Sequence, residues 1–294
     1  MNYSQFLNMF PEASLMVVLL ITFIADFCTS KRADREWFNP LVCLLMLAHI
    51  CFNIYPTEAA EAFGGMYTTG PAAGVLKTIL ALGTLIVMVQ AKEWLSRKDT
   101  AFKEGEFYML IISTLLGMNM MVSANHFLLF FLGLEMASVP MACLVAFDKY
   151  RHHSAEAGAK FVLTATFSSG VMIYGISLLY AACGTLYFED MANVITASPL
   201  TIAGMVFFFS GLGFKISLVP FHFWTADSYQ GAPTTVTGYL SVVSKGAAAF
   251  TLCAILMKVF QPMVEYWTVL LYIVIVLSIT IANLFAIRQS DLKR

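Results

Sequence analysis

Long apolar runs follow one another along this chain, separated by short polar segments. Each run has about 18 to 25 residues, which is long enough for a helix to cross a hydrocarbon core of about 30 Å. No separate soluble domain is left between them. We therefore predict nine membrane spans. They run roughly over Pro11–Cys28, Phe38–Tyr55, Pro71–Ala91, Glu106–Val122, Phe127–Phe147, Ala157–Ala182, Leu200–Pro220, Thr234–Met257 and Met263–Ile287.

The composition agrees with this pattern. Of the 294 residues, 59% are hydrophobic and only 12% are charged, whereas soluble domains carry about a quarter charged residues. We predict an all-α polytopic membrane protein that contacts the lipid bilayer and has no nucleic-acid partner. The first span follows no basic segment and has no small-residue cleavage site, so it is expected to remain as a membrane anchor.

The basic residues between the spans lie almost entirely on one side of the membrane. Assigning successive loops to alternate sides leaves only Lys258 on the other side. Because cytoplasmic loops carry the excess of Lys and Arg, we expect the N-terminus to face outside. The basic residues on the cytoplasmic side are Lys31, Arg32, Arg35, Lys92, Arg97, Lys98, Lys103, Lys149, Arg151, Arg288, Lys293 and Arg294.

Four ionisable residues inside the spans are the main functional candidates: Glu135, Lys160, Lys215 and Lys245. An ionisable group at the bilayer centre costs roughly 2.5 to 3.5 kcal/mol on insertion scales, and such groups are usually functional. A Glu–Lys contact at about 5 Å, in an effective dielectric of about 20, is worth roughly 3 kcal/mol. Making or breaking one such contact is enough to load or release a proton near neutral pH.

Glu135 and Lys245 are placed near the middle of the membrane, because they lie about nine and eleven residues into the fifth and eighth spans. Pro140 has no N–H, so the carbonyl of Met136 loses its helical partner and leaves a polar group near Glu135. We predict that Glu135 carries protons. The alternative is a buried ion pair that only fixes the register of the helix.

Lys160 follows Glu156 by four residues near the cytoplasmic start of the sixth span. One interpretation is an interfacial ion pair between these two residues. However, Thr164 and Ser168 continue the same helical face. This polar stripe favours a role for Lys160 in proton transfer.

Lys215 is bracketed by Gly211, Gly213 and Pro220, and this pattern predicts a broken or kinked helix in the seventh span. Broken membrane helices are tolerated where they line a cavity or are buried in protein, and half-helix ends supply dipoles for ions. We therefore predict that Lys215 is a functional residue at a helix break.

Other polar residues give weaker signals. His222 and Asp227 occupy the cytoplasmic turn after the seventh span, where protons can enter, but helix capping and anchoring explain them equally well. Lys77 is near one end of its span and is expected to snorkel to the interface. His49 and His126 are interpreted as interfacial or hydrogen-bonded core histidines.

The cysteines and the remaining histidines give no sign of a metal centre. The six cysteines show neither CxxC spacing nor a neighbouring histidine, so metal or iron–sulfur ligation is not expected. We interpret the cysteines as small buried hydrophobic residues. His152 and His153 are expected to be loop residues.

Five motifs are specific in combination and spread from about residue 105 to the C-terminus. They are Gly133-Leu134-Glu135-Met136, Gly211-Leu212-Gly213-Phe214-Lys215, Val219-Pro220-Phe221-His222-Phe223-Trp224, Tyr229-Gln230-Gly231-Ala232-Pro233-Thr234 and Ser244-Lys245. Together they resemble the antiporter-like membrane subunits of respiratory complex I. The resemblance implies a helical channel subunit without redox cofactors, in which Glu135, Lys160, Lys215 and Lys245 conduct or store protons.

The resemblance also implies a domain organisation. Residues 1–104 would form an N-terminal three-helix segment, and residues 105–258 a five-helix repeat made of spans four to eight, with the seventh helix broken. Residues 259–294 would be the first helix of a second, inverted repeat, whose remainder is absent from this sequence. We therefore expect the sequence to be C-terminally incomplete.

These features predict a proton-translocating, non-redox membrane subunit of an NADH:quinone oxidoreductase in the bacterial plasma membrane. Redox chemistry in other subunits would drive it, and its partners would include other antiporter-like membrane subunits. Two alternatives stay open. One is a subunit of a multisubunit cation/proton antiporter or membrane-bound hydrogenase, and the other is a truncated scaffold subunit that does not pump.

Overall fold

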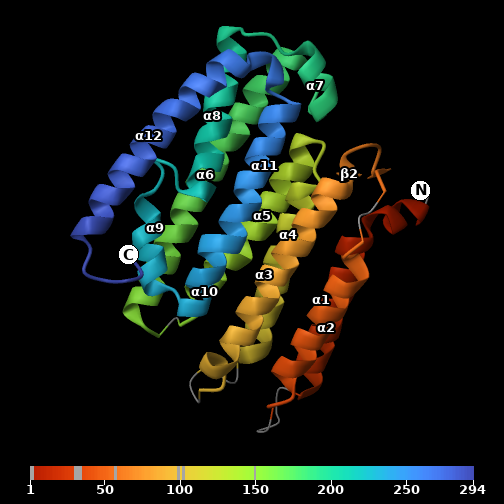
Figure 1. Ribbon diagram of the computed structural model, residues 1–294, viewed down its shortest axis with the longest axis vertical. Coiled ribbons are helices and arrows are strands. Elements are labelled where there is room, and N and C mark those ends of the chain that lie inside the picture. The colour runs from red at the N-terminus through yellow and green to blue at the C-terminus, as the bar shows by residue number, and fades with distance from the viewer. Residues whose placement is uncertain (1–2, 30–34, 56–57, 98–99, 101–102, 149) are drawn as a thin grey trace. The chain divides into compact units, whose positions relative to one another are not determined.

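The computed structural model describes residues 3–29, 35–55, 58–97, 100, 103–148 and 150–294. Regular structure in these residues is almost entirely helical (Figure 1). Eight of the described helices are long and apolar enough to cross a membrane, and one more apolar helix is shorter. The predicted all-α polytopic architecture is confirmed. Four of the basic loop residues used to predict the orientation, Lys31, Arg32, Lys98 and Lys149, lie outside the described residues.

The helices follow the predicted spans closely, apart from the sixth, which begins early enough to include His152 and His153. These histidines therefore belong to a helix and not to a loop, because the helix starts directly after Arg151. The elements are η1 (Tyr3–Met9), α1 (Phe10–Thr29), α2 (Phe38–Asn53), β1 (Ala60–Ala62), β2 (Tyr67–Thr69), α3 (Pro71–Leu95), α4 (Glu104–Val122), α5 (Phe127–Val145), α6 (His152–Cys183), α7 (Phe188–Val194), α8 (Pro199–Ile216), α9 (Phe223–Gly231), α10 (Thr234–Tyr239), the π-helix η3 (Leu240–Ser244), α11 (Lys245–Lys258), η4 (Gln261–Met263) and α12 (Val264–Arg288).

The chain forms two compact units, of which the first contains the described residues of Met1–Asn125, Leu129–Leu144 and Gly238–Ala247. In this unit α1 and α3 each pack against both α2 and α4. The antiparallel hairpin of β1 and β2 is a small exception to the all-helical prediction. The Asn125 N–H donates to the carbonyl of Met66, which holds the hairpin against the end of α4. Tyr67 is thereby fixed in the core, where it is fully buried.

Two glycines bring the backbones of α4 and α5 into close approach within this unit. A Cβ atom on Gly117 would lie 2.4 Å from the backbone nitrogen of Ala137, and one on Gly133 would lie 2.6 Å from that of Met121. Small residues allow membrane helices to pack at such short range. The glycine of the Gly-Leu-Glu motif therefore fixes α5 beside α4 two residues before Glu135.

The second unit contains His126–Leu128, Val145–Thr237 and Ala248–Arg294. Its centre is α6, which packs along α8 and α9. Gly175 and Gly231 allow this packing, since a Cβ atom on either would lie 2.5 Å or less from backbone atoms of a neighbouring element. By contrast, no residue of α12 is buried.

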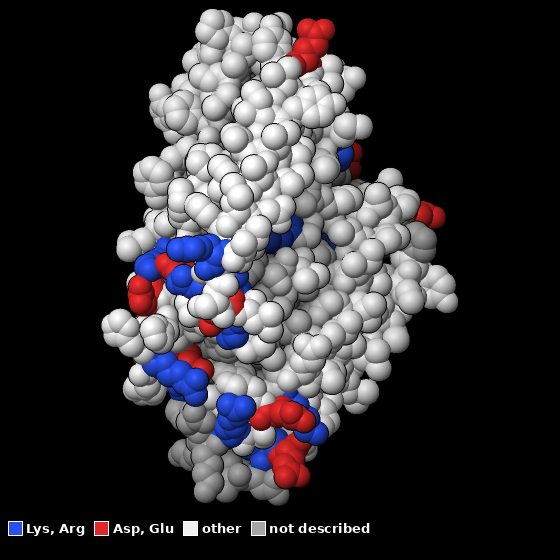
Figure 2. Space-filling model, turned by 60° about the vertical axis from the view of Figure 1, so that its left-hand side comes forward, with Lys and Arg blue, Asp and Glu red and all other residues white. Residues whose placement is uncertain are grey.

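The exposed surface suits a hydrocarbon environment. Large apolar side chains such as Leu20, Phe27 and Leu163 are more than half exposed, and on the face in Figure 2 uncharged side chains surround a few separate clusters of charge. The expectation that the cysteines are buried is wrong, because four are exposed and two are half-buried. A small apolar thiol is compatible with a helix surface that faces lipid.

Candidate functional site

Lys215 lies next to the end of α8, at a break in the seventh span. The helix ends at Ile216, Ser217 takes the left-handed conformation with φ of 67°, and the next helix begins at Phe223. The broken seventh helix predicted from the glycines and the proline is confirmed. Lys215 itself is buried, with 3% of its surface exposed.

The carbonyls of Gly213 and Phe214, just before the break, have partners, as backbone groups at a helix end in a membrane require. The N–H of Leu218 donates to the carbonyl of Gly213 at 2.8 Å. The indole N–H of Trp224 reaches back from α9 to the carbonyl of Phe214 at 3.1 Å. The negative end of the helix dipole also lies here, and it stabilises a cation such as the Lys215 ammonium group.

Lys160 takes part in a cluster of ion pairs within the same unit. Its Nζ lies 2.6 Å from Oδ2 of Asp227 and 2.7 Å from Oε1 of Glu156. Arg294 binds the other oxygen of Asp227, also at 2.6 Å. The ion pair with Glu156 anticipated from the spacing is present, but Asp227 adds a second partner from α9. The Lys160 side chain is 44% exposed, in contrast to that of Lys215.

This cluster lines an open cavity of about 190 Å³ between α6 and α9. Glu156, Lys160, Asp227 and Arg294 all contribute to its wall. Asp227 lies in the helix α9 and not in a turn as predicted, because α9 starts directly after His222. The open cavity therefore presents paired acidic and basic groups to water.

The predicted polar stripe on α6 borders a second cavity, of about 210 Å³, in the same unit. Thr164 and Ser168 line it together with Phe214 and Pro220 from the break. The Ser168 hydroxyl donates to the carbonyl of Gly211 at 2.8 Å, which ties α6 to α8. Most of the lining is apolar, so the hydroxyls are the groups to which water can bind.

His222 stands at the start of α9 with an unusual environment for an imidazole. Both ring nitrogens are buried and have no hydrogen-bond partner among the described residues. The ring packs against Phe223 and Phe285, at centroid distances of 4.5 and 5.6 Å. Neither anchoring by hydrogen bonds nor side-chain capping of α9 is observed for this residue.

Glu135 and Lys245 belong to the first compact unit and are both half-buried. Pro140 lies inside α5 little more than one turn after Glu135, as its position in the sequence indicated. Lys245 directly follows the π-helix η3, which packs against α3. Single π-helical turns are frequent at functional sites, and this irregularity was not predicted.

Sequence reasoning missed a buried ion pair in the first unit. Lys77 does not snorkel to an interface, since its Nζ is buried and donates to Oε1 of Glu12 at 2.5 Å. The hydroxyl of Tyr67 donates to the other carboxylate oxygen at 2.7 Å. The available signal was that the first and third spans carry charges of opposite sign.

His126 has the structural role that was expected. Its Nδ1 accepts a hydrogen bond from the Leu128 N–H at 3.0 Å, and its ring meets Tyr187 edge to face. Burial lowers the pKa of His126 below its usual value. The residue therefore fixes the segment before α5 through its contacts with Leu128 and Tyr187.

The described residues thus form a polytopic helical membrane protein with acids and lysines in its spans and a break in the seventh span beside the buried Lys215. The family model described as "NADH:quinone oxidoreductase/Mrp antiporter, TM" matches residues 124–294. The chain belongs to this family.

Individual relatives extend the match over the whole chain. NADH-quinone oxidoreductase subunit N of Phocaeicola vulgatus is 60% identical over 294 residues, which is 100% of this chain and 62% of the relative. The subunit N of Azobacteroides pseudotrichonymphae is 46% identical, with the same coverage. The chain thus spans less than two thirds of the length of these curated relatives.

Two solved structures share the fold of nearly the whole chain. A chain of respiratory complex I from Thermus thermophilus with bound aureothin superposes with a TM-score of 0.77 at 28% identity, covering 96% of this chain and 60% of that one. A chain of the archaeal membrane-bound sulfane sulfur reductase shares the fold, with a TM-score of 0.73 at 21% identity, covering 98% of this chain and 60% of that one.

Proposed function

We propose that this chain is part of a proton-translocating, non-redox membrane subunit of an NADH:quinone oxidoreductase. The observation that carries the proposal is the buried Lys215 at the break that follows α8, because an ionisable group in apolar surroundings is retained where it serves transport. The relatives at 60% and 46% identity are both named as subunits of this oxidoreductase. Their names favour it over a cation/proton antiporter, a membrane-bound hydrogenase or a scaffold.

In the proposed mechanism, protons enter from the cytoplasmic side toward Lys160 and Lys215. The Lys160–Asp227 ion pair, in its open cavity, is suited to exchange protons with water. Glu135 modulates the charge on the lysines, and Lys245 passes the proton laterally. His222 and Asp227 contribute to entry, and no group in the chain carries electrons.

The proposal also covers the location of the chain and its partners. It would lie in the bacterial plasma membrane with its N-terminus outside, as the distribution of basic residues predicts. Other membrane subunits, including further antiporter-like ones, would be its partners, and the redox cofactors would be held elsewhere in the complex. The division into residues 1–104, 105–258 and 259–294 stays a prediction from the resemblance.

Substitution of Lys215 tests the proposal. In the full-length subunit within its complex, Lys215→Ala should abolish proton pumping by reconstituted vesicles while the subunit still assembles. Glu135→Ala should do the same. Lys258→Ala is the matched control, because this lysine is exposed at the end of α11 and its loss should leave pumping unchanged. Unchanged pumping in the Lys215 and Glu135 variants would refute the proposal.

Copurification distinguishes an NADH:quinone oxidoreductase from a membrane-bound hydrogenase or a cation/proton antiporter. The soluble subunits that copurify with the tagged chain should include an NADH-oxidising module. Recovery of a hydrogenase module, or of antiporter subunits alone, would instead favour the alternatives.

A further inference from the structure

The first compact unit contains a buried charged cluster that the proposed mechanism does not use. It consists of Glu12 from α1, Tyr67 from β2 and Lys77 from α3, all buried. Besides its ion pair with Glu12, the Lys77 ammonium group lies 2.9 Å from the Tyr67 hydroxyl. Each of the three groups thus contacts the other two, so a proton can be shared among them.

A second polar cluster lies on α1 and α2. The Ser14 hydroxyl is 2.9 Å from Nδ1 of His49 and accepts a hydrogen bond from the Asn53 amide at 3.2 Å. That amide also donates to the backbone carbonyl of His49 at 2.7 Å. His49 and Asn53 are both more than nine-tenths buried, with 4% and 9% of their surface exposed.

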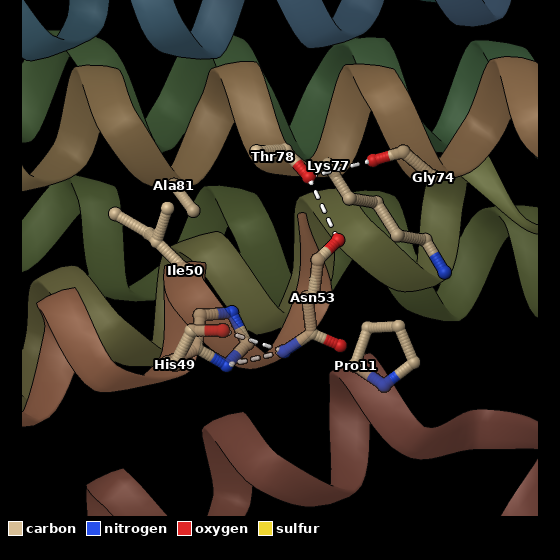
Figure 3. A pocket seen from close by; sticks show the side chains of 8 residues that line it. All are labelled: Pro11, His49, Ile50, Asn53, Gly74, Lys77, Thr78 and Ala81. Atoms are coloured by element: carbon tan, nitrogen blue, oxygen red, sulfur yellow. Dashed lines mark hydrogen bonds between the residues drawn. The ribbon is translucent and has the colours of Figure 1, made fainter. Parts of the chain in front are cut away.

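A small cavity of about 10 Å³ adjoins both clusters. Figure 3 shows its lining, to which Lys77 contributes from the first cluster and His49 and Asn53 from the second. This volume is about that needed to hold one water molecule.

Asn53 supplies an independent sign that a ligand belongs there. Its Oδ1 atom is buried and has no hydrogen-bond partner among the described residues, and in Figure 3 this oxygen points away from His49 toward Pro11. Buried polar atoms are nearly always hydrogen-bonded to protein or to ordered water. A water in the cavity would donate to Asn53 Oδ1, and Lys77 and His49 line the same cavity, so it offers further polar groups to a buried water, which needs two to four partners.

We propose that this cavity binds one water molecule, which joins the Glu12–Tyr67–Lys77 cluster to His49 and Asn53 as a second proton-exchange network in the N-terminal helices. A proton that leaves the Lys77 ammonium group passes to the water oxygen, and the water releases another of its protons to the His49 ring. Only N–H and O–H bonds form and break, and no further reactant is needed. The functional part of this inference rests on the proposed function.

The water site is tested directly by an experimental map of the full-length subunit in its complex. Density for one ordered water within hydrogen-bond distance of Asn53 Oδ1 is the expected result. Asn53→Leu should remove this density, whereas Cys51→Leu, on an exposed position of the same helix, should retain it. A dry cavity in the wild-type complex would overturn the inference.

Proton pumping tests the role of the network. Asn53→Leu and the double variant Glu12→Gln/Lys77→Met should lower the number of protons pumped per electron while NADH oxidation continues, and Cys51→Leu should match the wild type. The double variant removes both charges together, so it still tests the role of the network in pumping if Asn53→Leu fails to assemble. Lys215→Ala is measured alongside. If Lys215→Ala stops pumping but both network variants pump normally, the network has no role and the proposed function stands. If Lys215→Ala also pumps normally, the proposed function itself fails.

Discussion

Two ion pairs of nearly equal length, one in each unit, differ strongly in their exposure to solvent. Lys77 and Glu12 approach to 2.5 Å with side chains 3% and 2% exposed, whereas Lys160 and Asp227 approach to 2.6 Å with side chains 44% and 30% exposed. A buried charge that loses its partner is left uncompensated, but an exposed one is solvated by water and screened by salt. The distance alone therefore does not reveal the role. The buried pair should fix three elements in place, and the exposed pair should open and close readily.

The largest effect expected from this contrast is that of Lys77→Met. Removing the ammonium group leaves the Glu12 carboxylate buried without its partner, which should destabilise the protein by about 3 to 5 kcal/mol. Thermal unfolding of the detergent-solubilised protein would measure this loss. A change no larger than that of Lys258→Met, at an exposed position, would contradict the assignment of Lys77 to the core.

An intermediate effect is expected when both charges are removed. Glu12→Gln/Lys77→Met should recover most of the stability lost in Lys77→Met, because replacing a buried ion pair by uncharged groups of similar volume is often close to neutral. A double-mutant cycle with the two single variants gives the coupling. Additive losses in the cycle would show that the two side chains do not interact.

The smallest effect is expected for Lys160→Met. The pair with Asp227 is open to solvent, so the unfolding temperature should stay close to that of the wild type and any difference should shrink as salt is added. Its effect on proton pumping should nevertheless be large if Lys160 takes up protons. A severe loss of stability that persists at high salt would show that the cluster is structural.

The spans and the helix break could be predicted because their causes are local. Hydrophobic length determines a membrane helix, and Gly211, Gly213 and Pro220 lie next to the break that they allow. The contacts of Glu12, Tyr67 and Arg294 could not be predicted in the same way. The contacts of Glu12 with Tyr67 and Lys77, and of Arg294 with Asp227, join residues 55 or more positions apart in the sequence, so only the tertiary packing reveals them.

Local patterns also failed where the backbone departs from its usual geometry. The segment with His222 and Asp227 was predicted as a turn after the seventh span, but α9 begins directly after His222 and includes Asp227. The π-helix η3 could not be predicted from the sequence, because Leu240–Ser244 contains no Gly or Pro. The break beside Lys215 was thus predicted from the sequence, whereas the irregular backbone before Lys245 was not.

The π-helix before Lys245 has a consequence for how sequences in this family are aligned and recombined. An α-helix turns by about 100° per residue, and a π-helical turn holds more residues than an α-helical one. Deleting one residue within Leu240–Ser244 could convert η3 to α-helix and keep Lys245 on its present face. The same deletion within α10, before η3, would turn Lys245 by about 100° relative to the start of the span. Gaps in alignments and junctions of chimeric proteins therefore belong inside η3.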